Sequence, residues 1–131
     1  MEPIEFWEEQ HHRYAKKDWI DKPTLFAESV IKYFPKNGKV LDLGAGHGQD
    51  SRYFASFGYS VLCTDYSNAA HDYAKKKDRA KILEFQKLDL SDGKLPYKDN
   101  EFDVVYAHLS LHYFLFVFFS IYQIRKFILV F

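Results

Sequence analysis

The turn Gly-Ala-Gly-His-Gly at residues 44–48 is the part of this sequence with the clearest capacity for ligand chemistry. Glycine adopts backbone conformations that other residues avoid, and a turn that leads into a helix directs bare N–H groups and the positive end of the helix dipole toward a ligand. Such a turn suits an anionic or carboxylate group. Because glycine-rich turns also occur as plain structural turns, this turn alone leaves both interpretations open.

A carboxylate follows at a spacing that suits a nucleoside ligand. Asp65 lies nineteen residues after Gly46 and ends the next apolar run. In a parallel sheet this register places an acid beside the ribose of a nucleoside held at the first turn, where two carboxylate oxygens can accept from both ribose hydroxyls. An isolated acid at a strand end is usually a solvated turn residue, but its register with the glycine turn favours a binding role.

The spacing of the glycines distinguishes two classes of nucleoside cofactor. A dinucleotide fingerprint, G-x-G-x-x-G, that began at Gly44 would need a glycine at position 49, where the sequence has Gln49. The third glycine, Gly48, comes one position early, and Asp42 precedes the first glycine by two positions. A nucleotide- or dinucleotide-binding oxidoreductase is therefore an alternative that the spacing disfavours.

Apolar periodicity predicts the strands and helices that must position these residues. The predicted strands are 39–43, 60–64, 82–88 and 102–107, and the predicted helices begin near Ile4, near Pro23, after Gly48 and at Ser67. Strands that alternate with helices imply a parallel sheet with right-handed crossovers and helices on both faces. The expected fold class is α/β, a Rossmann-like parallel sheet flanked by helices, with an N-terminal helical segment.

Length and composition limit the class of protein and its partners. A chain of 131 residues with 47% hydrophobic residues fits one folded domain rather than a disordered chain. Its 18 basic and 18 acidic side chains cancel, so no overall charge attracts a polyanion and we expect no nucleic-acid partner. The single cysteine, Cys63, cannot form an internal disulfide, and the acidic start Met1-Glu2-Pro3 is unlike a signal peptide, so the expected location is cytoplasmic.

Several segments together resemble one enzyme family. The run Val-Leu-Asp-Leu-Gly-Ala-Gly-His-Gly at 40–48 resembles the first motif of class I S-adenosylmethionine-dependent methyltransferases. Residues 60–67 are similar to their second strand, 88–90 to the end of their third strand, and 95–106 to the approach to their fourth strand. The resemblance covers about residues 39–113 and is nearest to members with small-molecule substrates. It implies S-adenosyl-L-methionine as the cofactor and a small-molecule methyl acceptor.

The resemblance also implies which residues bind the cofactor at its methionine end. Gly44, Ala45 and Gly46 would approach the methionine part of S-adenosylmethionine. Asp42 would hold the loop. Because the sulfonium is already activated, the protein would act chiefly by positioning the acceptor and excluding water, so no catalytic base is implied.

Further residues are implied for the adenosyl end and the acceptor side. Asp65 would bind the ribose diol, and Tyr66 would line the adenine. Asp89 and Leu90 would meet the adenine from the next strand. His108, just past the fourth strand, would face the methionine or the substrate.

Two other polar clusters are expected to carry no chemistry. His108 and His112 are four residues apart and would share a helix face, but no third ligand stands at a suitable spacing, so we expect no metal site. The basic run 75–81 is interleaved with Asp72 and Asp78 and is typical of a solvated helix face rather than a phosphate-binding patch.

The C-terminal part departs from the family pattern. The expected organisation is a helical lead at 1–38, a cofactor-binding core at 39–112 and an atypical aromatic tail at 113–131. Members of the family continue with a further helix and more strands, so we expect an incomplete sheet with about four of the usual seven strands, from a truncated chain. The apolar run in the tail has roughly ten residues, too few for a membrane span. The tail could pack as a strand or helix on the open sheet edge, or cause self-association.

The incomplete pattern leaves a second function open. A chain that lacks these strands could be a truncated, non-catalytic remnant that holds the cofactor or serves as a partner surface.

Overall fold

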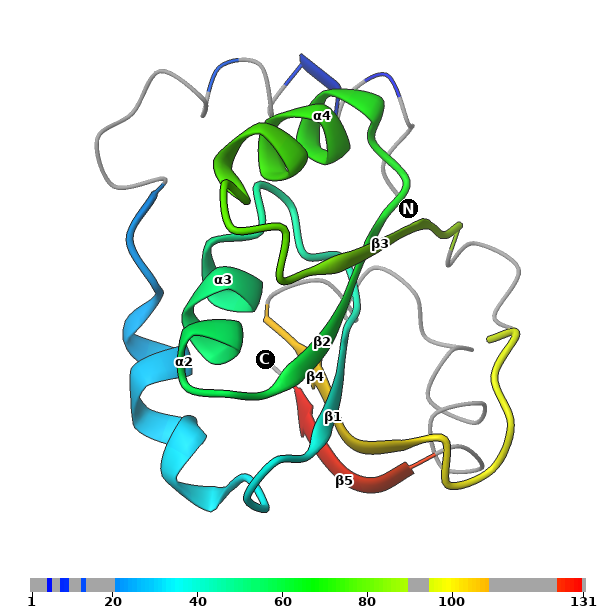
Figure 1. Cartoon of the computed structure of the whole chain (residues 1–131). Helices are drawn as coiled ribbons and strands as arrows, with labels where there is room; N and C mark the ends of the chain where they lie inside the picture. Colours follow the sequence, from blue (N-terminus) through cyan, green and yellow to red (C-terminus); the bar gives the residue numbers. More distant parts are fainter. Residues whose placement is uncertain are drawn as a thin grey trace.

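The molecule is built on one parallel sheet with helices against one of its faces (Figure 1). The computed structural model describes residues 21–89 and 95–108, the backbone of 125–130, and four helical positions near the N-terminus, namely Glu5, Glu8, Glu9 and Arg13. The strands are β1 (Lys39–Asp42), β2 (Ser60–Asp65), β3 (Glu84–Lys87), β4 (Phe102–Ala107) and β5 (Arg125–Val130). The helices are α2 (Leu25–Val30), the 3-10 turn η2 (Ile31–Tyr33), α3 (Gln49–Ser56) and α4 (Asn68–Lys77).

The strand order creates a switch point in the middle of the sheet. The order is β3-β2-β1-β4-β5, and every pair of neighbours is parallel. Val40 of β1 lies opposite Val61 of β2 on one side and Val104 of β4 on the other. From β1, the strands β2 and β3 follow on one side of the sheet, and β4 and β5 follow on the other side. Open α/β sheets bind ligands at the carboxyl ends of the strands at such a point. The predicted α/β Rossmann-like fold class is confirmed.

β5 adds a strand beyond the four that the sequence predicted. It pairs in parallel with β4, from Phe102↔Arg125 to Ala107↔Val130. Its run Phe-Ile-Leu-Val at 127–130 is rich in aromatic and β-branched residues, which suit a strand, and β4 offers a nearly all-apolar partner. The described sheet thus has five strands, one more than the four that the sequence marked.

Helix starts follow the capping side chains. The Ser67 hydroxyl accepts the Ala70 N–H at 3.1 Å and caps α4, as predicted. The helix expected to begin near Pro23 begins slightly later, because the Thr24 hydroxyl accepts the Ala27 N–H at 3.1 Å and makes Thr24 the N-cap of α2. The helix predicted from Ile4 onward lies mostly outside the described residues.

Two apolar clusters lie on opposite faces of the sheet. The cluster beneath α2 and α3 contains Val30, Phe34, Val40, Phe54, Val61, Val104 and Tyr106 among others. The second cluster contains Leu41, Leu43, Leu88, Phe102, Val105 and Ala107. All three described α-helices lie on the first face (Figure 1). Residues 90–94 and 109–124 lie outside the described residues.

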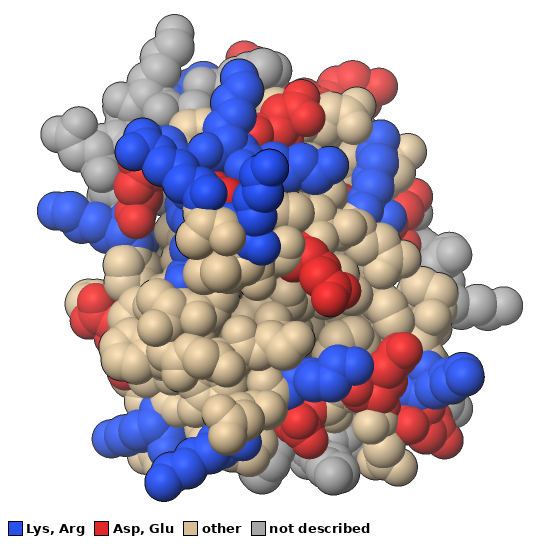
Figure 2. All heavy atoms as spheres, in the orientation of Figure 1, with Lys and Arg blue, Asp and Glu red and all other residues tan. Residues whose placement is uncertain are grey.

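The surface over α4 carries most of the clustered basic charge. Figure 2 shows lysine and arginine gathered there with acidic side chains at the margins. Lys75, Lys76, Arg79 and Lys81 are exposed, whereas Lys77 pairs with an aspartate. Within the described part of the chain, no helix has the length and apolar character needed to cross a membrane.

Asp50, in the first turn of α3, joins three elements. Its carboxylate accepts the N–H of Thr24 at 2.7 Å and the hydroxyl of Thr24 at 2.8 Å, which attaches α2. It also accepts the hydroxyl of Tyr106 from β4 at 2.6 Å. Asp50 is 6% exposed and Tyr106 is 1% exposed, so these bonds form away from water. One buried carboxylate thus sets how α2 and α3 sit on the sheet.

We expect Asp50→Ala to lower the free energy of unfolding by about 2–4 kcal/mol, because it leaves the buried Tyr106 hydroxyl and the Thr24 donors without an acceptor. Urea unfolding followed by circular dichroism measures the change. Asp50→Asn keeps one carbonyl acceptor and should lose less. The exposed Asp99→Ala is the control and should change stability by no more than about 0.5 kcal/mol. A loss for Asp50→Ala as small as that of the control would contradict this role.

Candidate functional site

The glycine turn leaves β1 at the switch point and stays bonded to both neighbouring strands. Leu43 donates its N–H to the carbonyl of Tyr106 in β4 at 2.9 Å. Ala45 donates its N–H to the carbonyl of Thr64 in β2 at 2.8 Å. The turn is therefore fixed to both sides of the switch point. Because the Ala45 N–H is bonded within the protein, the turn presents fewer free donors to a ligand than the sequence suggested.

The Asp65 carboxylate lies directly against the turn. Its Oδ2 accepts the Gly46 N–H at 2.8 Å, and its Oδ1 accepts the Ser67 N–H at 2.9 Å. Gly46 has φ 62°, a left-handed conformation that glycine adopts without strain. A carboxylate has about four lone-pair sites, so each oxygen keeps capacity for a further hydrogen bond. The structure brings the predicted turn and the predicted acid together, while their binding roles stay predictions.

Gly48 is the point where the turn passes close to α4. Its φ is 78°, and a Cβ added there would lie 3.0 Å from the Cβ of Ala74 and 3.6 Å from the Sγ of Cys63. Any side chain at this position would push α4 away from the turn. Cys63 is 2% exposed, and burial raises the pKa of its thiol.

Asp42 is buried beneath the turn with 2% exposure. Its Oδ2 accepts from the Ser51 hydroxyl at 2.6 Å, and its main-chain carbonyl accepts from the Thr64 hydroxyl at 2.7 Å. Burial raises the pKa of the Asp42 carboxyl well above its usual value, the bond from Ser51 opposes this rise, and the charges of Asp50 and Asp65 add to it. Asp42 thus connects the end of β1 to α3 and β2.

The residues predicted for the adenine side reach the same edge of the sheet. Tyr66 is half-buried, and the Nζ of Lys87 lies 4.7 Å from the centroid of its ring. The same Nζ donates to Oδ1 of Asn68 at 2.9 Å, so the ammonium is held over one face of the tyrosine. Asp89 is exposed and follows β3 closely. Leu90 lies outside the described residues.

His108 follows β4 directly at the carboxyl edge. Its ring stacks on Phe26 of α2 with centroids 5.2 Å apart, and Phe26 also stacks on Tyr106 at 5.8 Å. Among the described residues, the buried Nδ1 of His108 has no hydrogen-bond partner. Tyr106 of β4 pairs with Asp42 of β1, and His108 and Gly44 each follow their pairing residue by two positions. His108 and Gly44 therefore come at the same level after the ends of these neighbouring strands.

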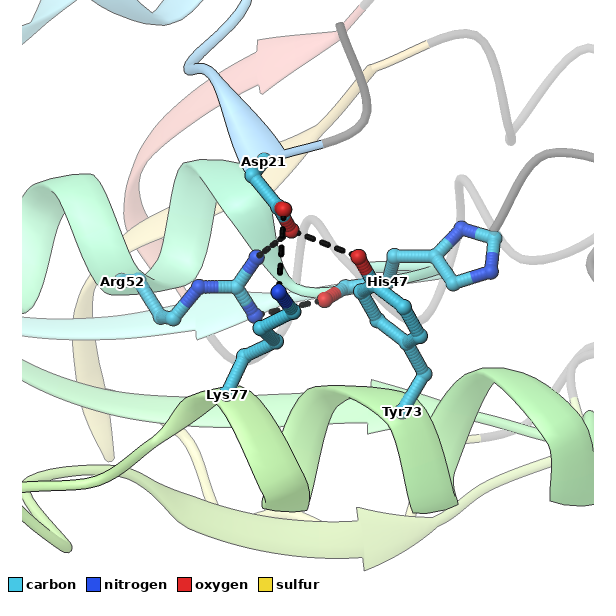
Figure 3. A network of polar contacts seen from close by, with 5 residues as sticks. All are labelled: Asp21, His47, Arg52, Tyr73 and Lys77. Atoms are coloured by element: carbon cyan, nitrogen blue, oxygen red, sulfur yellow. Dashed lines mark hydrogen bonds and ion pairs between the residues drawn. The ribbon is translucent and has the colours of Figure 1, made fainter. Parts of the chain in front are cut away.

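Asp21, which the sequence did not mark as a site residue, organises a polar network behind the turn (Figure 3). Its carboxylate accepts the Tyr73 hydroxyl at 2.7 Å and pairs with Lys77 at 3.1 Å and with Arg52 at 3.7 Å. The hydrogen bond from Tyr73 lowers the pKa of Asp21. Arg52 Nη1 also donates to the carbonyl of His47 at 2.7 Å, and the Tyr73 ring meets the His47 ring edge-on at 4.6 Å.

The supporting residues could not be found by spacing. Asp50 reaches Tyr106 across 56 positions, and the Asp21 network draws its members from three separate segments. Isolated acids and tyrosines of this kind have no local pattern that marks them. His112 lies outside the described residues, and among those that are described no group of three His, Cys, Asp or Glu residues could hold a metal ion.

The fold and this edge together define a class of protein. A parallel sheet with a glycine turn after β1 and an acid at the end of β2, both at the switch point, is a Rossmann-like nucleoside-binding domain. The model of the family described as a methyltransferase domain matches residues 41–125. The chain belongs to this family, the class I S-adenosylmethionine-dependent methyltransferases, and the resemblance seen in the sequence is confirmed.

Curated relatives with amine substrates are similar to part of the chain. The glycine/sarcosine/dimethylglycine N-methyltransferase of Actinopolyspora halophila is 40% identical over 76 residues, which is 55% of this chain and 13% of that protein. The sarcosine/dimethylglycine N-methyltransferase of Aphanothece halophytica is 33% identical over 85 residues, which is 62% of this chain and 30% of that protein. The chain therefore spans less than a third of the length of either relative.

Solved structures share the fold. The S-adenosylmethionine-dependent methyltransferase of Aquifex aeolicus superposes with a TM-score of 0.70 at 21% identity, over 91% of this chain and 67% of that one. That of Mesorhizobium loti superposes with a TM-score of 0.57 at 28% identity, over 66% of this chain and 42% of that one.

The raised pKa of Asp42 predicts a specific pH dependence of stability. A carboxyl with a higher pKa in the folded state keeps its proton at pH values where the unfolded chain has lost it, so the free energy of unfolding falls as pH rises above 3.8. The fall is up to about 1.4 kcal/mol per pH unit until the pH reaches the folded-state pKa. Asp42→Asn removes this titration, so its stability relative to the unmodified protein should increase with pH over that range.

Urea unfolding of both proteins at a series of pH values measures this difference, in which the carboxyls that do not interact with Asp42 cancel. The exposed Asp99→Asn is the control and should show a constant difference. A difference for Asp42→Asn that is independent of pH would show that the carboxyl is not perturbed by its burial.

Proposed function

We propose that this chain binds S-adenosyl-L-methionine at the glycine turn and Asp65 and transfers its methyl group to a small-molecule acceptor. The observation that carries the proposal is the Asp65 carboxylate, held 2.8 Å from the Gly46 N–H at the switch point of the sheet. Its two oxygens are oriented by protein N–H groups and retain lone pairs for the two ribose hydroxyls. Tyr66 and Asp89 would then line the adenine side.

The charge of the site supports a cationic ligand. Asp50 and Asp65 both raise the pKa of Asp42, so three carboxyl groups lie within electrostatic reach of one another. The ion pairs that Asp21 makes do not involve these groups. S-adenosylmethionine carries a positive sulfonium and an α-ammonium group, which the Asp65 carboxylate beside the turn would favour.

The names of the relatives suggest the class of acceptor. Both curated relatives are N-methyltransferases whose names give sarcosine and dimethylglycine as substrates. A small amine of the N-methylglycine type is therefore the first acceptor to test. His108 and Phe26 would stand on the acceptor side, where the Nδ1 of His108 can form one hydrogen bond to a polar ligand.

The cofactor, when bound, supplies an already activated methyl group on a positive sulfur. The chain's own residues have the task of binding and orientation. The glycine turn and Asp65 would fix the adenosyl part, and Phe26 with His108 would limit access of water to the acceptor. Binding and orientation of this kind require no acid–base residue in the turn itself.

Isothermal titration calorimetry with S-adenosylhomocysteine and with NAD tests the cofactor. We expect binding of S-adenosylhomocysteine and none of NAD. Asp65→Ala should weaken that binding by about 1–3 kcal/mol, because it removes buried hydrogen bonds to the ribose. The exposed Asp99→Ala should bind as the unmodified protein does. Unfolding measurements on each variant separate a loss of affinity from a loss of fold.

Transfer of a labelled methyl group to glycine, sarcosine and dimethylglycine tests the reaction. Tight S-adenosylhomocysteine binding without transfer to any small acceptor would indicate a cofactor-binding protein rather than an enzyme. Binding of NAD alone would overturn the assignment in favour of the dinucleotide alternative.

A further inference from the structure

The contacts of Asp21 converge on one residue of the cofactor turn. Asp21 receives the Tyr73 hydroxyl at 2.7 Å and pairs with Arg52 at 3.7 Å. Both of these partners also contact His47, since the Tyr73 ring packs against its ring and Arg52 binds its carbonyl. Figure 3 shows the Asp21 carboxylate joined to Arg52 and to the Tyr73 hydroxyl, and Arg52 joined in turn to the His47 carbonyl. His47 is 2% exposed and lies between Gly46 and Gly48.

The three partners of Asp21 come from helices that border the turn. Arg52 is in α3, and Tyr73 and Lys77 are in α4, one turn of helix apart. Asp21 itself precedes α2 and belongs to neither helix. Its carboxylate therefore links α3 to α4 across the back of the turn, where Gly48 leaves no room for a side chain to do so.

A second carboxylate from ahead of α2 binds α4 at its other end. Glu8 accepts the N–H of Asn68 and, at 3.0 Å, the N–H of Ala69, which are the first residues of α4. These N–H groups follow directly on Asp65, Tyr66 and Ser67. The candidate cofactor site has two ends, the glycine turn and the strand end at Asp65. Each end lies next to a helix that binds a carboxylate from a residue before α2.

We propose that Asp21 and Tyr73 are positioning residues for the cofactor turn, so that docking of Asp21 on α3 and α4 sets the affinity of the turn for its nucleoside ligand. The inference rests on the proposed function, because it concerns the same turn. Asp21 acts through Tyr73 and Arg52 on His47, and His47 fixes the two flanking glycines. Without this link, the Gly46 N–H still has Asp65 and the Gly48 N–H still has the Ala45 carbonyl as acceptors, but the turn loses a support from α3 and α4 and leaves this conformation more often.

Global stability depends little on the same contacts. The Asp21 side chain is 44% exposed, and ion pairs at such exposure contribute little to folding because water and salt screen them. A local effect on the turn and a global effect on unfolding are therefore separable. This separation makes the proposal testable without relying on enzyme activity.

Amide hydrogen exchange of the protein without ligand is the first test. Asp21→Ala should speed exchange at the Gly46 and Gly48 amides by about 3- to 10-fold relative to the core amide of Val104. Tyr73→Phe keeps the ring against His47 and the Asp21–Arg52 pair and removes only the hydroxyl, so it should speed exchange in the same direction, by no more than Asp21→Ala does. Because the Tyr73 hydroxyl acts through Asp21, the double variant should exchange no faster than Asp21→Ala alone.

The matched control is Asp78→Ala. Asp78 accepts the N–H groups of Ile82 at 3.2 Å and Leu83 at 3.0 Å beyond the end of α4, so its loss weakens the fold and removes none of the hydrogen bonds or ion pairs that Asp21 makes. It should leave turn exchange unchanged relative to Val104. If Asp21→Ala and Tyr73→Phe behave like this control, the network is merely structural and the proposal fails.

Calorimetry with S-adenosylhomocysteine is the second test. The dissociation constant should rise by about 3- to 10-fold in Asp21→Ala and Tyr73→Phe and stay unchanged in Asp78→Ala. Faster exchange at the turn with an unchanged dissociation constant would overturn the coupling to ligand affinity. If the unmodified protein does not bind S-adenosylhomocysteine at all, the proposed function fails, and with it the coupling, while the exchange result still decides whether Asp21 positions the turn.

Discussion

The pairing of Gly46 with Asp65 is the interaction on which the site depends. It joins the turn after β1 to the end of β2, and it requires those strands to be in the correct register. The ladder from Lys39↔Ser60 to Asp42↔Cys63 supplies that register. A shift of β2 by one residue would carry the carboxylate to the opposite face of the sheet, because strand side chains alternate. The position of the acid is thus a property of the whole parallel pair and not of the turn alone.

The sequence predicted the features that repeat with a local period or a fixed spacing. The strand runs, the glycine turn, the Ser67 cap and the distance from Gly46 to Asp65 all follow from short-range rules, and they gave the fold class and the edge where the candidate site lies. The sequence predicted the position of the turn but not the hydrogen bonds that its N–H groups form within the protein. Its Ala45 and Gly46 N–H groups bind Thr64 and Asp65 rather than pointing freely outward.

The features that spacing could not reveal are tertiary. Asp50 receives bonds from α2 and β4, and Asp21 bridges two helices, yet each is an ordinary acid in its own sequence neighbourhood. β5 was anticipated only as one outcome for the tail, because a run of aromatic and aliphatic residues suits a strand or a buried helix equally until a partner edge is known. The cation over Tyr66 likewise depends on β3 lying beside β2.

The buried acids show that the site is not arranged for maximum stability. Burial raises the pKa of the Asp42 carboxyl, and the charges of Asp50 and Asp65 add to that rise. The hydrogen bond from Ser51 opposes it, and Thr24 and Tyr106 donate hydrogen bonds to the Asp50 carboxylate. Local violations of this kind are expected where a protein serves a ligand rather than its own packing.

The buried thiol of Cys63 can report on opening of the structure around the glycine turn. It is the only cysteine of the chain, it is enclosed, and its sulfur lies just beneath the position of Gly48. Thiols react as thiolates, and burial keeps this one protonated and covered. An alkylating reagent can therefore reach it only when the structure around it opens. The rate of its labelling reports how often this region beneath the glycine turn opens, in a chain that has no other thiol to obscure the measurement.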